Sequence, residues 1–333
     1  MTEDKKTRSE QTADIQVDIQ ALANQVQAET EKIIVGKSSL IRMVIMSVLA
    51  GGHVLLDDFP GVGKTTLVRT ISIALGCQMR RVQFVPDLLP SDITGMRIFN
   101  QKTGDFELRH GPVMTNLLLA DEINRAIPRT QAALLEAMEE HQVSIDGECF
   151  PLPEPFLVLA TQNPVEMEST FRLPAAQMDR FLVRLTVGYP GREEEREMLE
   201  RVGNHIPYEQ VKPVTGPEGL IAAQKQIEQV YVSDQTADYI IRLTQATRDH
   251  AQLSMGASPR ASRGLYRAAR VWAAMEGRTF VTPDDVKALA HPVLEHRLVV
   301  SGEARFSGVA AGAVLDEILD KTTATPEPAK VLQ

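Results

Sequence analysis

The sequence predicts an α/β protein whose parallel sheet is sandwiched by helices, with a smaller all-α domain after it. Three observations lead to this prediction. Short apolar runs alternate with helical patterns in the first 190 residues, a glycine-rich turn links the first run to a helix, and strand patterns give way to helical ones after Tyr189-Pro190-Gly191. Near-continuous apolar strands that alternate with helices are typical of a parallel sheet buried on both faces.

The predicted elements follow in chain order. Apolar residues recur at helical spacing over 15–34 and 40–49, which predicts two leading helices. Two more helices are expected between the strands, at 64–75 and 129–140. The strands are expected at the short apolar runs, which are 53–57, 80–84, 116–120, 155–161 and 180–187.

Residues 92–113 break this alternation. Two short strand patterns flank Lys102-Thr103-Gly104, a turn signal. We therefore expect a β-hairpin inserted into the α/β run.

The periodicity changes at Pro190-Gly191, and we divide the chain at this turn signal. The expected parts are a disordered N-terminus at 1–14, an α/β core at 15–190, an all-α domain at 191–320 and a disordered tail at 321–333. The helices of the second domain are expected at 192–202, 216–230, 234–250, 259–276 and 283–295.

Composition and charge exclude several classes of protein. The net charge is −9 over 333 residues and no basic run is present, which argues against a protein that mainly binds nucleic acid. The N-terminus is polar, and no stretch approaches the ~20 apolar residues that span a bilayer. We expect a cytoplasmic protein without an integral membrane segment. Cys77 and Cys149 match no metal or redox spacing and are expected to be buried thiols.

The segment DFPGVGKT at 58–65 follows a predicted strand and opens a predicted helix. In this context the pattern predicts a P-loop, in which backbone N–H groups surround the phosphates of a nucleotide. Lys64 is expected to reach the β- and γ-phosphates, and the Thr65 hydroxyl to bind Mg²⁺. We therefore expect ATP and Mg²⁺ as cofactors. The expected binding residues are Pro60, Gly61, Val62, Gly63, Lys64, Thr65 and Thr66.

A second motif, LLLADE at 117–122, ends an apolar strand in two carboxylates. Ligands of open α/β sheets bind at the carboxyl ends of the strands. Asp121 is expected to hold Mg²⁺ through water, and Glu122 to orient and polarise the attacking water. A strand that merely ends in solvated acids is the alternative, and the P-loop earlier in the chain argues against it.

Three further residues complete the candidate site. Asn163 follows a strand and is expected to hold the attacking water or the γ-phosphate, with a plain Asn-Pro turn as the alternative. Arg180 lies at a helix-to-strand junction, where an ion pair with Asp179 is the alternative. Arg260 is expected in the first turn of a helix, where a cation is unfavourable. A γ-phosphate across the domain boundary would compensate this charge, and a plain surface arginine is the alternative.

These motifs, in this order, resemble the AAA+ ATPases and, within them, the MoxR family. The resemblance extends from about Val35 to Arg297. An acidic residue in place of the first P-loop glycine, as at Asp58, is common in MoxR-like chains. The segments that carry the resemblance are VQFVPDLLPSDITG (82–95), GPVMTNLLLADEINRAIPRTQAALLEAMEE (111–140), ATQNPVEMESTFRLPAAQMDRF (160–181) and GASPRAS (256–262).

The resemblance implies a role for several residues. Val35 and Gly36 would line the adenine pocket, and Asn163 would be the sensor 1 residue. Arg260 would be sensor 2, and Arg180 would be the arginine finger that reaches the ATP of the neighbouring subunit.

The resemblance also implies an assembly and an activity. A finger supplied by a neighbour implies a homo-oligomeric ring, which in this family is usually a hexamer. The hairpin at 92–113 would be the helix-2 insert, and Gln83 would restrain Glu122. The implied activity is ATP-driven remodelling of protein complexes, including cofactor or metal insertion, with a von Willebrand factor A-domain (VWA) protein as partner.

Two other functions stay open. The chain is alternatively the motor subunit of a metal chelatase, because magnesium chelatase subunits share the insert and the finger; the segments 82–95 and 160–181 favour the MoxR-type interpretation. A DNA-directed AAA+ machine is a third hypothesis, disfavoured by the acidic charge balance and the lack of a recognisable DNA-binding module.

Overall fold

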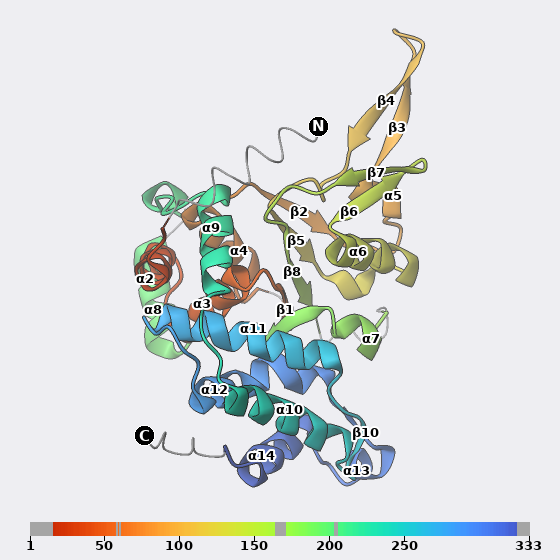
Figure 1. The fold of residues 1–333 in the computed structure, drawn as a ribbon. Coiled ribbons are helices and arrows are strands. Elements are labelled where there is room, and N and C mark those ends of the chain that lie inside the picture. The colour runs from red at the N-terminus through yellow and green to blue at the C-terminus, as the bar shows by residue number, and fades with distance from the viewer. Residues whose placement is uncertain (1–15, 58, 60, 164–170, 203–205, 325–333) are drawn as a thin grey trace.

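A five-stranded parallel sheet forms the centre of the first half of the chain (Figure 1). The structure, a computed structural model, describes residues 16–57, 59, 61–163, 171–202 and 206–324. The strand order is β2-β5-β8-β1-β9, and the five predicted strands are confirmed. They are β1 (His53–Asp57), β2 (Met79–Gln83), β5 (Leu117–Asp121), β8 (Leu157–Gln162) and β9 (Phe181–Leu185).

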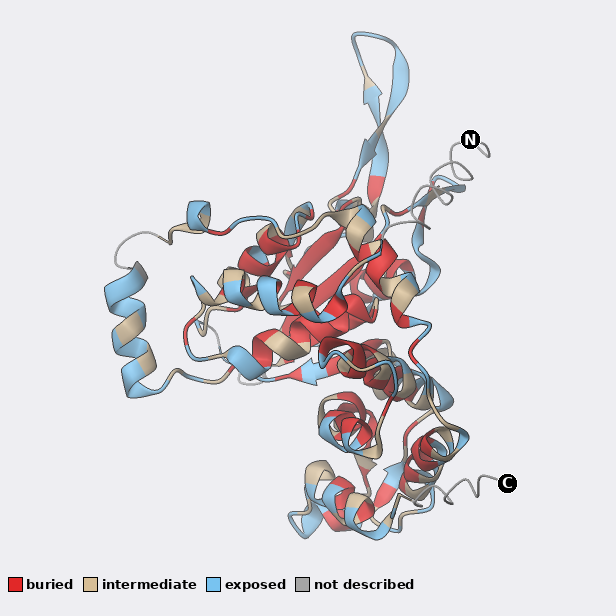
Figure 2. Cartoon of the chain, turned by 60° about the vertical axis from the view of Figure 1, so that its left-hand side comes forward, coloured by how far each residue is buried: buried red, intermediate tan, exposed pale blue. Residues whose placement is uncertain are grey.

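Alternate residues of each strand enter two different apolar clusters, so the sheet is buried on both faces. Leu117 and Leu119 share one cluster with helices α2, α3 and α4, whereas Leu118 and Ala120 share the other with α6. Figure 2 shows the buried residues concentrated along the strands and the helices against them. The predicted doubly wound α/β architecture is confirmed. The helices are α2 (Ile19–Glu31), α3 (Ser38–Leu49), α4 (Lys64–Ala74) and α6 (Pro128–Glu140).

The predicted insertion is a long hairpin that projects from the body of the protein (Figure 1). It follows the short helix α5 (Pro90–Thr94) and consists of β3 (Gly95–Asn100) and β4 (Asp105–His110), paired from Gly95↔His110 to Asn100↔Asp105. The turn lies at the predicted Lys102-Thr103-Gly104.

A second hairpin, β6 (Gln142–Ile145) with β7 (Glu148–Pro151), was not predicted. Its signal was the Asp146-Gly147 dipeptide, whose two residues have positive φ as in a type I′ turn. Cys149 is exposed on this hairpin, so the prediction of two buried thiols is wrong for it. Cys77 is buried, and burial raises the pKa of its thiol to about 12.

The C-terminal part is mainly helical, and the five predicted helices are present. The prediction that strands stop at Gly191 is wrong, because β10 and β11 form a short antiparallel pair. The predicted disordered N-terminus at 1–14 and residues 325–333 of the tail predicted at 321–333 lie outside the described residues, but Lys321 belongs to a helix. The short helix α7 (Ala175–Met178) lies between β8 and β9. The elements of the C-terminal part are α8 (Arg192–Val202), α9 (Pro217–Ile227), α10 (Asp234–Arg248), β10 (Leu253–Met255), α11 (Pro259–Met275), α12 (Pro283–Leu294), β11 (Val299–Val300), α13 (Gly302–Phe306) and α14 (Ala311–Lys321).

The helical part shares its core with the sheet. The apolar cluster on the α3 and α4 face continues into α11, α12 and α14 without a break. A buried arginine, Arg297, adds a polar tie between the two parts. Its Nε lies 2.8 Å from Oδ1 of Asp179, and its Nη2 donates to the carbonyl of Phe181 at 2.6 Å. The start of β9 is therefore anchored to the segment that follows α12.

Replacing Arg297 with methionine should destabilise the protein by about 3 kcal/mol, because it removes the cation that pairs with the Asp179 carboxylate and donates to three backbone carbonyls. Urea unfolding measures the change. The control is Arg196→Met, which removes only an exposed i,i+4 pair on α8 and should change stability by less than about 0.5 kcal/mol. A loss of under about 1 kcal/mol for Arg297→Met contradicts the anchoring role.

Two buried histidines make stability depend on pH. His53 accepts from the Val158 N–H at Nδ1 and lies 3.2 Å from the Met138 carbonyl at Nε2, and burial lowers its pKa to about 4. Burial likewise lowers the pKa of His296 to about 3. The unfolded chain binds these protons more readily, so the stabilisation is full above pH ~6.5 and is lost as pH falls.

Between pH 6.5 and 4 the His53 contribution should amount to about 3 kcal/mol. His53→Asn, which does not titrate, should therefore show a flatter decline of unfolding free energy over this range than the wild type. The exposed His110→Asn is the matched control. Equal slopes for wild type and His53→Asn contradict the assignment.

Candidate nucleotide site

The predicted phosphate loop connects the carboxyl end of β1 to the first turn of α4. Gly61 and Gly63 have φ of 84° and 86°, a left-handed conformation that L side chains rarely adopt. A Cβ at either position would meet no atom within 4 Å, so the backbone and not packing requires glycine here. Asp58 and Pro60 lie outside the described residues.

Lys64 is the first residue of α4 and is buried, with 8% of its surface exposed. Its Nζ donates to the carbonyl of Phe59 at 3.1 Å, which folds the side chain back over the loop. A buried cation at a helix N-terminus opposes the helix dipole, and a bound phosphate would reverse this penalty. Thr65 and Thr66 follow in the same turn and are half-buried, and Val62 packs against the core.

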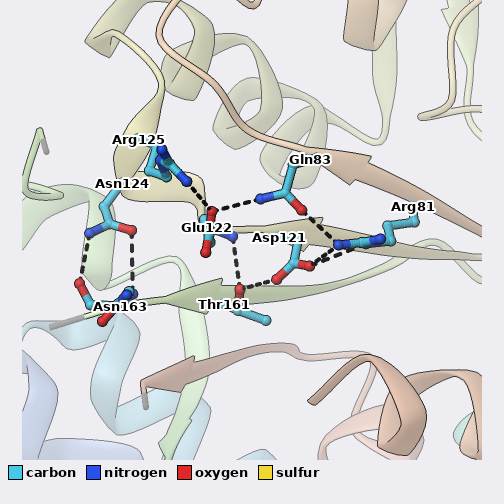
Figure 3. A network of polar contacts seen from close by, with 8 residues as sticks. All are labelled: Arg81, Gln83, Asp121, Glu122, Asn124, Arg125, Thr161 and Asn163. Carbon is cyan, nitrogen blue, oxygen red and sulfur yellow. Dashed lines mark hydrogen bonds and ion pairs between the residues drawn. The ribbon is translucent and has the colours of Figure 1, made fainter. Parts of the chain in front are cut away.

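The two predicted carboxylates stand at the end of β5 (Figure 3). Asp121 is buried, and Glu122 has φ 55° and ψ 50°, a left-handed conformation that is uncommon and strained for a residue with a Cβ. Thr161 of β8 links the pair: its hydroxyl donates to Oδ1 of Asp121 at 2.6 Å and accepts from the Glu122 N–H at 2.8 Å. Two strands thus fix both acids.

Strand β2 contributes donors to both acids. Arg81 donates to Oδ2 of Asp121, from Nη2 at 2.7 Å and from Nε at 3.1 Å. Gln83 donates from Nε2 to Oε2 of Glu122 at 2.7 Å, so the predicted contact between these two residues is confirmed. Arg125 donates to the same oxygen at 2.9 Å. The catalytic candidate is therefore held by an amide and a guanidinium.

Asn163 lies just beyond β8, next to β1 in the sheet, and is buried. Asn124 pairs with its backbone: Nδ2 donates to the Asn163 carbonyl at 3.1 Å, and Oδ1 accepts the Asn163 N–H at 3.5 Å. The structure thus brings Asn163 to the same edge of the sheet as the acids and the P-loop.

The proposed adenine-pocket residues lie beside the loop. Val35 is buried, and Gly36 (φ 69°) lies so close to Glu194 of α8 that a Cβ would overlap the carboxylate. Lys37 Nζ donates to the carbonyl of Tyr189, and the Tyr189 ring stacks on Phe59 of the loop at 5.5 Å. The segment after α2 and the loop therefore meet at Tyr189.

Arg180 and Arg260 lie together, at the opposite edge of the sheet. Both pair with Glu139 of α6, Arg180 through Nε at 3.2 Å. They line a cavity of about 290 Å³ next to His53, the first residue of β1, whereas the P-loop follows its last residue. The ends of β1 are roughly 13 Å apart.

This placement corrects two sequence interpretations. Arg260 does not face the P-loop of its own chain across the domain boundary, because α11 begins at the amino edge of the sheet with Pro259 at its first position. The alternative partner for Arg180 was Asp179, but Asp179 pairs with Arg297.

ATP and Mg²⁺ fit the residues present. Hydroxyl and carboxylate oxygens, as in Thr65 and Asp121, are the ligands that Mg²⁺ prefers, completed by water and phosphate oxygens. Among the described residues no three His, Cys, Asp or Glu side chains gather into a metal site.

Sequence reasoning missed several residues that hold this site. A signal existed for some: Arg81 and Gln83 are two apart on a strand and so share a face. Thr161 lies in the same strand-end motif as Asn163. Nothing in the sequence pairs Glu139 with the two arginines. The residues missed are Arg81, Asn124, Arg125, Glu139 and Thr161.

In the part of the chain that the structure describes, no helix has both the length and the apolar character needed to cross a bilayer.

Similarity to known proteins agrees with this site. Residues 53–183 match the ATPase family associated with various cellular activities (AAA), and residues 245–318 match the AAA lid domain. The chain is 45% identical over 304 residues to the uncharacterized protein YeaC of Bacillus subtilis, covering 91% of this chain and 95% of that protein. It is 44% identical over 308 residues to Chaperone MoxR1 of Mycobacterium tuberculosis, covering 90% and 81%.

A crystal structure from Cytophaga hutchinsonii, described as a candidate ATPase, superimposes with a TM-score of 0.88 at 37% identity, covering 97% of this chain and 99% of that one. The chain has a P-loop after β1 and two carboxylates at the end of β5, and relatives named MoxR or Chaperone MoxR1 are more than 30% identical to it over most of its length. It therefore belongs to the MoxR family of AAA+ ATPases.

Proposed function

We propose that the protein hydrolyses ATP with Mg²⁺ and uses the cycle to remodel protein complexes. The observation that carries this proposal is the arrangement of Asp121 and Glu122: one acid is buried at the end of β5, on the same edge of the sheet as the P-loop, and the other is strained and restrained by donors. A site that only bound nucleotide would have no need of the second acid.

The binding roles follow from position. The N–H groups around Gly61 and Gly63 and the Lys64 ammonium bind the phosphates, and Val35 and Gly36 contact adenine. Thr65 and Asp121 would hold Mg²⁺, which when bound neutralises phosphate charge.

The hydrolytic roles belong to two other residues. Glu122 orients the attacking water and accepts its proton, once its carboxylate turns from Gln83 and Arg125 to the γ-phosphate. Asn163 is neutral and held by Asn124, and it orients the water or the γ-phosphate without adding negative charge.

The arginines support a ring. Arg180 and Arg260 lie at the edge of the sheet that is remote from the P-loop of their own chain. Each therefore contacts the nucleotide bound by a neighbouring copy. A head-to-tail interface of this kind closes into a ring, and we propose a hexamer. In the single chain Glu139 takes the place of the phosphate as counter-ion to both arginines.

The name of Chaperone MoxR1 supports a protein client, and we propose a VWA-domain protein as the partner that delivers it. A chelatase motor is the second candidate, because it would use the same site. Copurification from the native host discriminates the two: a VWA-domain protein supports the first, and a chelatase large subunit contradicts it.

Glu122→Gln should lower the turnover number at least about 100-fold while ATP affinity changes less than about threefold, because only the proton acceptor is lost. Phosphate release and binding of a fluorescent ATP analogue measure the two quantities. The control Glu303→Gln makes the same charge change on exposed α13 and should hydrolyse normally. Hydrolysis near the wild-type rate by Glu122→Gln contradicts the assignment.

Arg180→Ala should lose hydrolysis by a factor of about 10³ and keep ATP binding, as for a finger supplied by a neighbour. Mixing tests the neighbour directly. Arg180→Ala has a P-loop without a finger, and Lys64→Ala has a finger without a working P-loop. Each alone should be inactive, and the mixture should recover part of the turnover. A mixture as inactive as its components shows that Arg180 does not act on a neighbouring site.

A further inference from the structure

Arg81 of β2 forms an ion pair with Asp121, the candidate metal ligand at the end of the neighbouring strand β5. Its Nε and Nη2 both donate to Oδ2 of Asp121, and the Thr161 hydroxyl donates to Oδ1. These bonds fill three of the roughly four acceptor positions of a carboxylate. Mg²⁺ or a metal-bound water that approaches Oδ2 of Asp121 therefore competes with a guanidinium, and two cations close to one carboxylate also repel each other.

The same guanidinium reaches the second acid indirectly. Nη2 of Arg81 donates to Oε1 of Gln83 at 2.7 Å as well as to Asp121. This bond orients the Gln83 amide so that its Nε2 points at Glu122, to which it donates at 2.7 Å. Figure 3 shows one continuous chain of contacts from Asp121 through Arg81 and Gln83 to Glu122.

Packing does not require Arg81 at this position. Half of its side chain (49%) is exposed, and the β2–β5 ladder pairs through the backbone from Met79↔Leu117 to Gln83↔Asp121. An exposed guanidinium has room to swing away, whereas Asp121, with 11% of its side chain exposed, does not. The movable partner of this pair is the arginine.

We propose that Arg81 is a positioning residue that competes with Mg²⁺ for Asp121 and releases Gln83 from Glu122 when the metal enters. Loading of Mg²⁺–ATP then removes the Gln83 restraint and leaves Arg125 as the remaining donor to the catalytic carboxylate, whereas the empty site keeps both restraints. The proposal rests on the proposed function, since it takes Asp121 as the metal ligand and Glu122 as the base.

The first test measures metal binding without hydrolysis. The full-length protein is titrated with Mg²⁺ in the presence of a mant-labelled AMPPNP, and the midpoint of the fluorescence rise is compared between variants. Arg81→Gln should lower the Mg²⁺ midpoint about tenfold, because loss of a charge-assisted hydrogen bond removes the competitor. The matched control is Arg80→Gln, whose side chain points to the other face and donates to the Gly111 carbonyl.

The second test measures the link to Glu122. Gln83→Ala should change ATP turnover several-fold in the wild-type background and hardly at all in an Arg81→Gln or Arg81→Lys background, because neither replacement bridges Asp121 and Gln83 as the planar guanidinium does. Arg81→Lys keeps the charge, so it carries this test should Arg81→Gln fail to fold. An equal effect of Gln83→Ala in all backgrounds overturns the proposal.

The outcomes separate this proposal from the proposed function. If analogue binding to the wild type needs no Mg²⁺, the metal role of Asp121 itself is wrong. If the wild type needs Mg²⁺ but Arg81→Gln has the midpoint of Arg80→Gln, only the role of Arg81 is overturned. Weaker analogue binding by Arg81→Gln both with and without Mg²⁺ would make Arg81 a phosphate ligand and also overturns it.

Discussion

The site depends on two negative charges placed side by side at the end of one strand. Buried carboxylates are costly unless donors surround them, and like charges repel. The chain meets both problems at Asp121 and Glu122 by turning the second residue into the left-handed conformation and by giving each acid its own donors. Thr161 then locks the pair to β8. Much of the polar side-chain network at this edge serves that constraint.

Charge is divided between the two edges of the sheet. The carboxyl edge holds the P-loop and the acids, which suits a cationic metal and its nucleotide, and the amino edge gathers arginines around the cavity next to His53. Under the proposed function, a single chain carries two complementary halves of a site, which lie at different edges of the sheet. The buried tie of Arg297 to Asp179 and Phe181 fixes the helical part against the amino edge, which sets where Arg260 lies.

The sequence predicted the sheet because strands buried on both faces are apolar throughout, and it predicted the loop and acids because those motifs are contiguous. Most of its failures have a common cause. The position of Arg260 depends on how α11 packs, and the contacts of Glu139, Arg81 and Thr161 join residues that are distant along the chain. The β6–β7 hairpin was local and was overlooked, although Asp146-Gly147 signals it. Spacing within an element is visible in a sequence, whereas contacts between elements are not.

The central claim is that the nucleotide held by one chain is completed by the arginines of another. A structure of the assembled protein with Mg²⁺ and AMPPNP tests it most directly. The account predicts that Arg180 leaves Glu139 and lies within hydrogen-bonding distance of the γ-phosphate bound at Lys64 of the adjacent copy. A γ-phosphate contacted by side chains of its own chain alone, with Arg180 still paired to Glu139, would contradict the account.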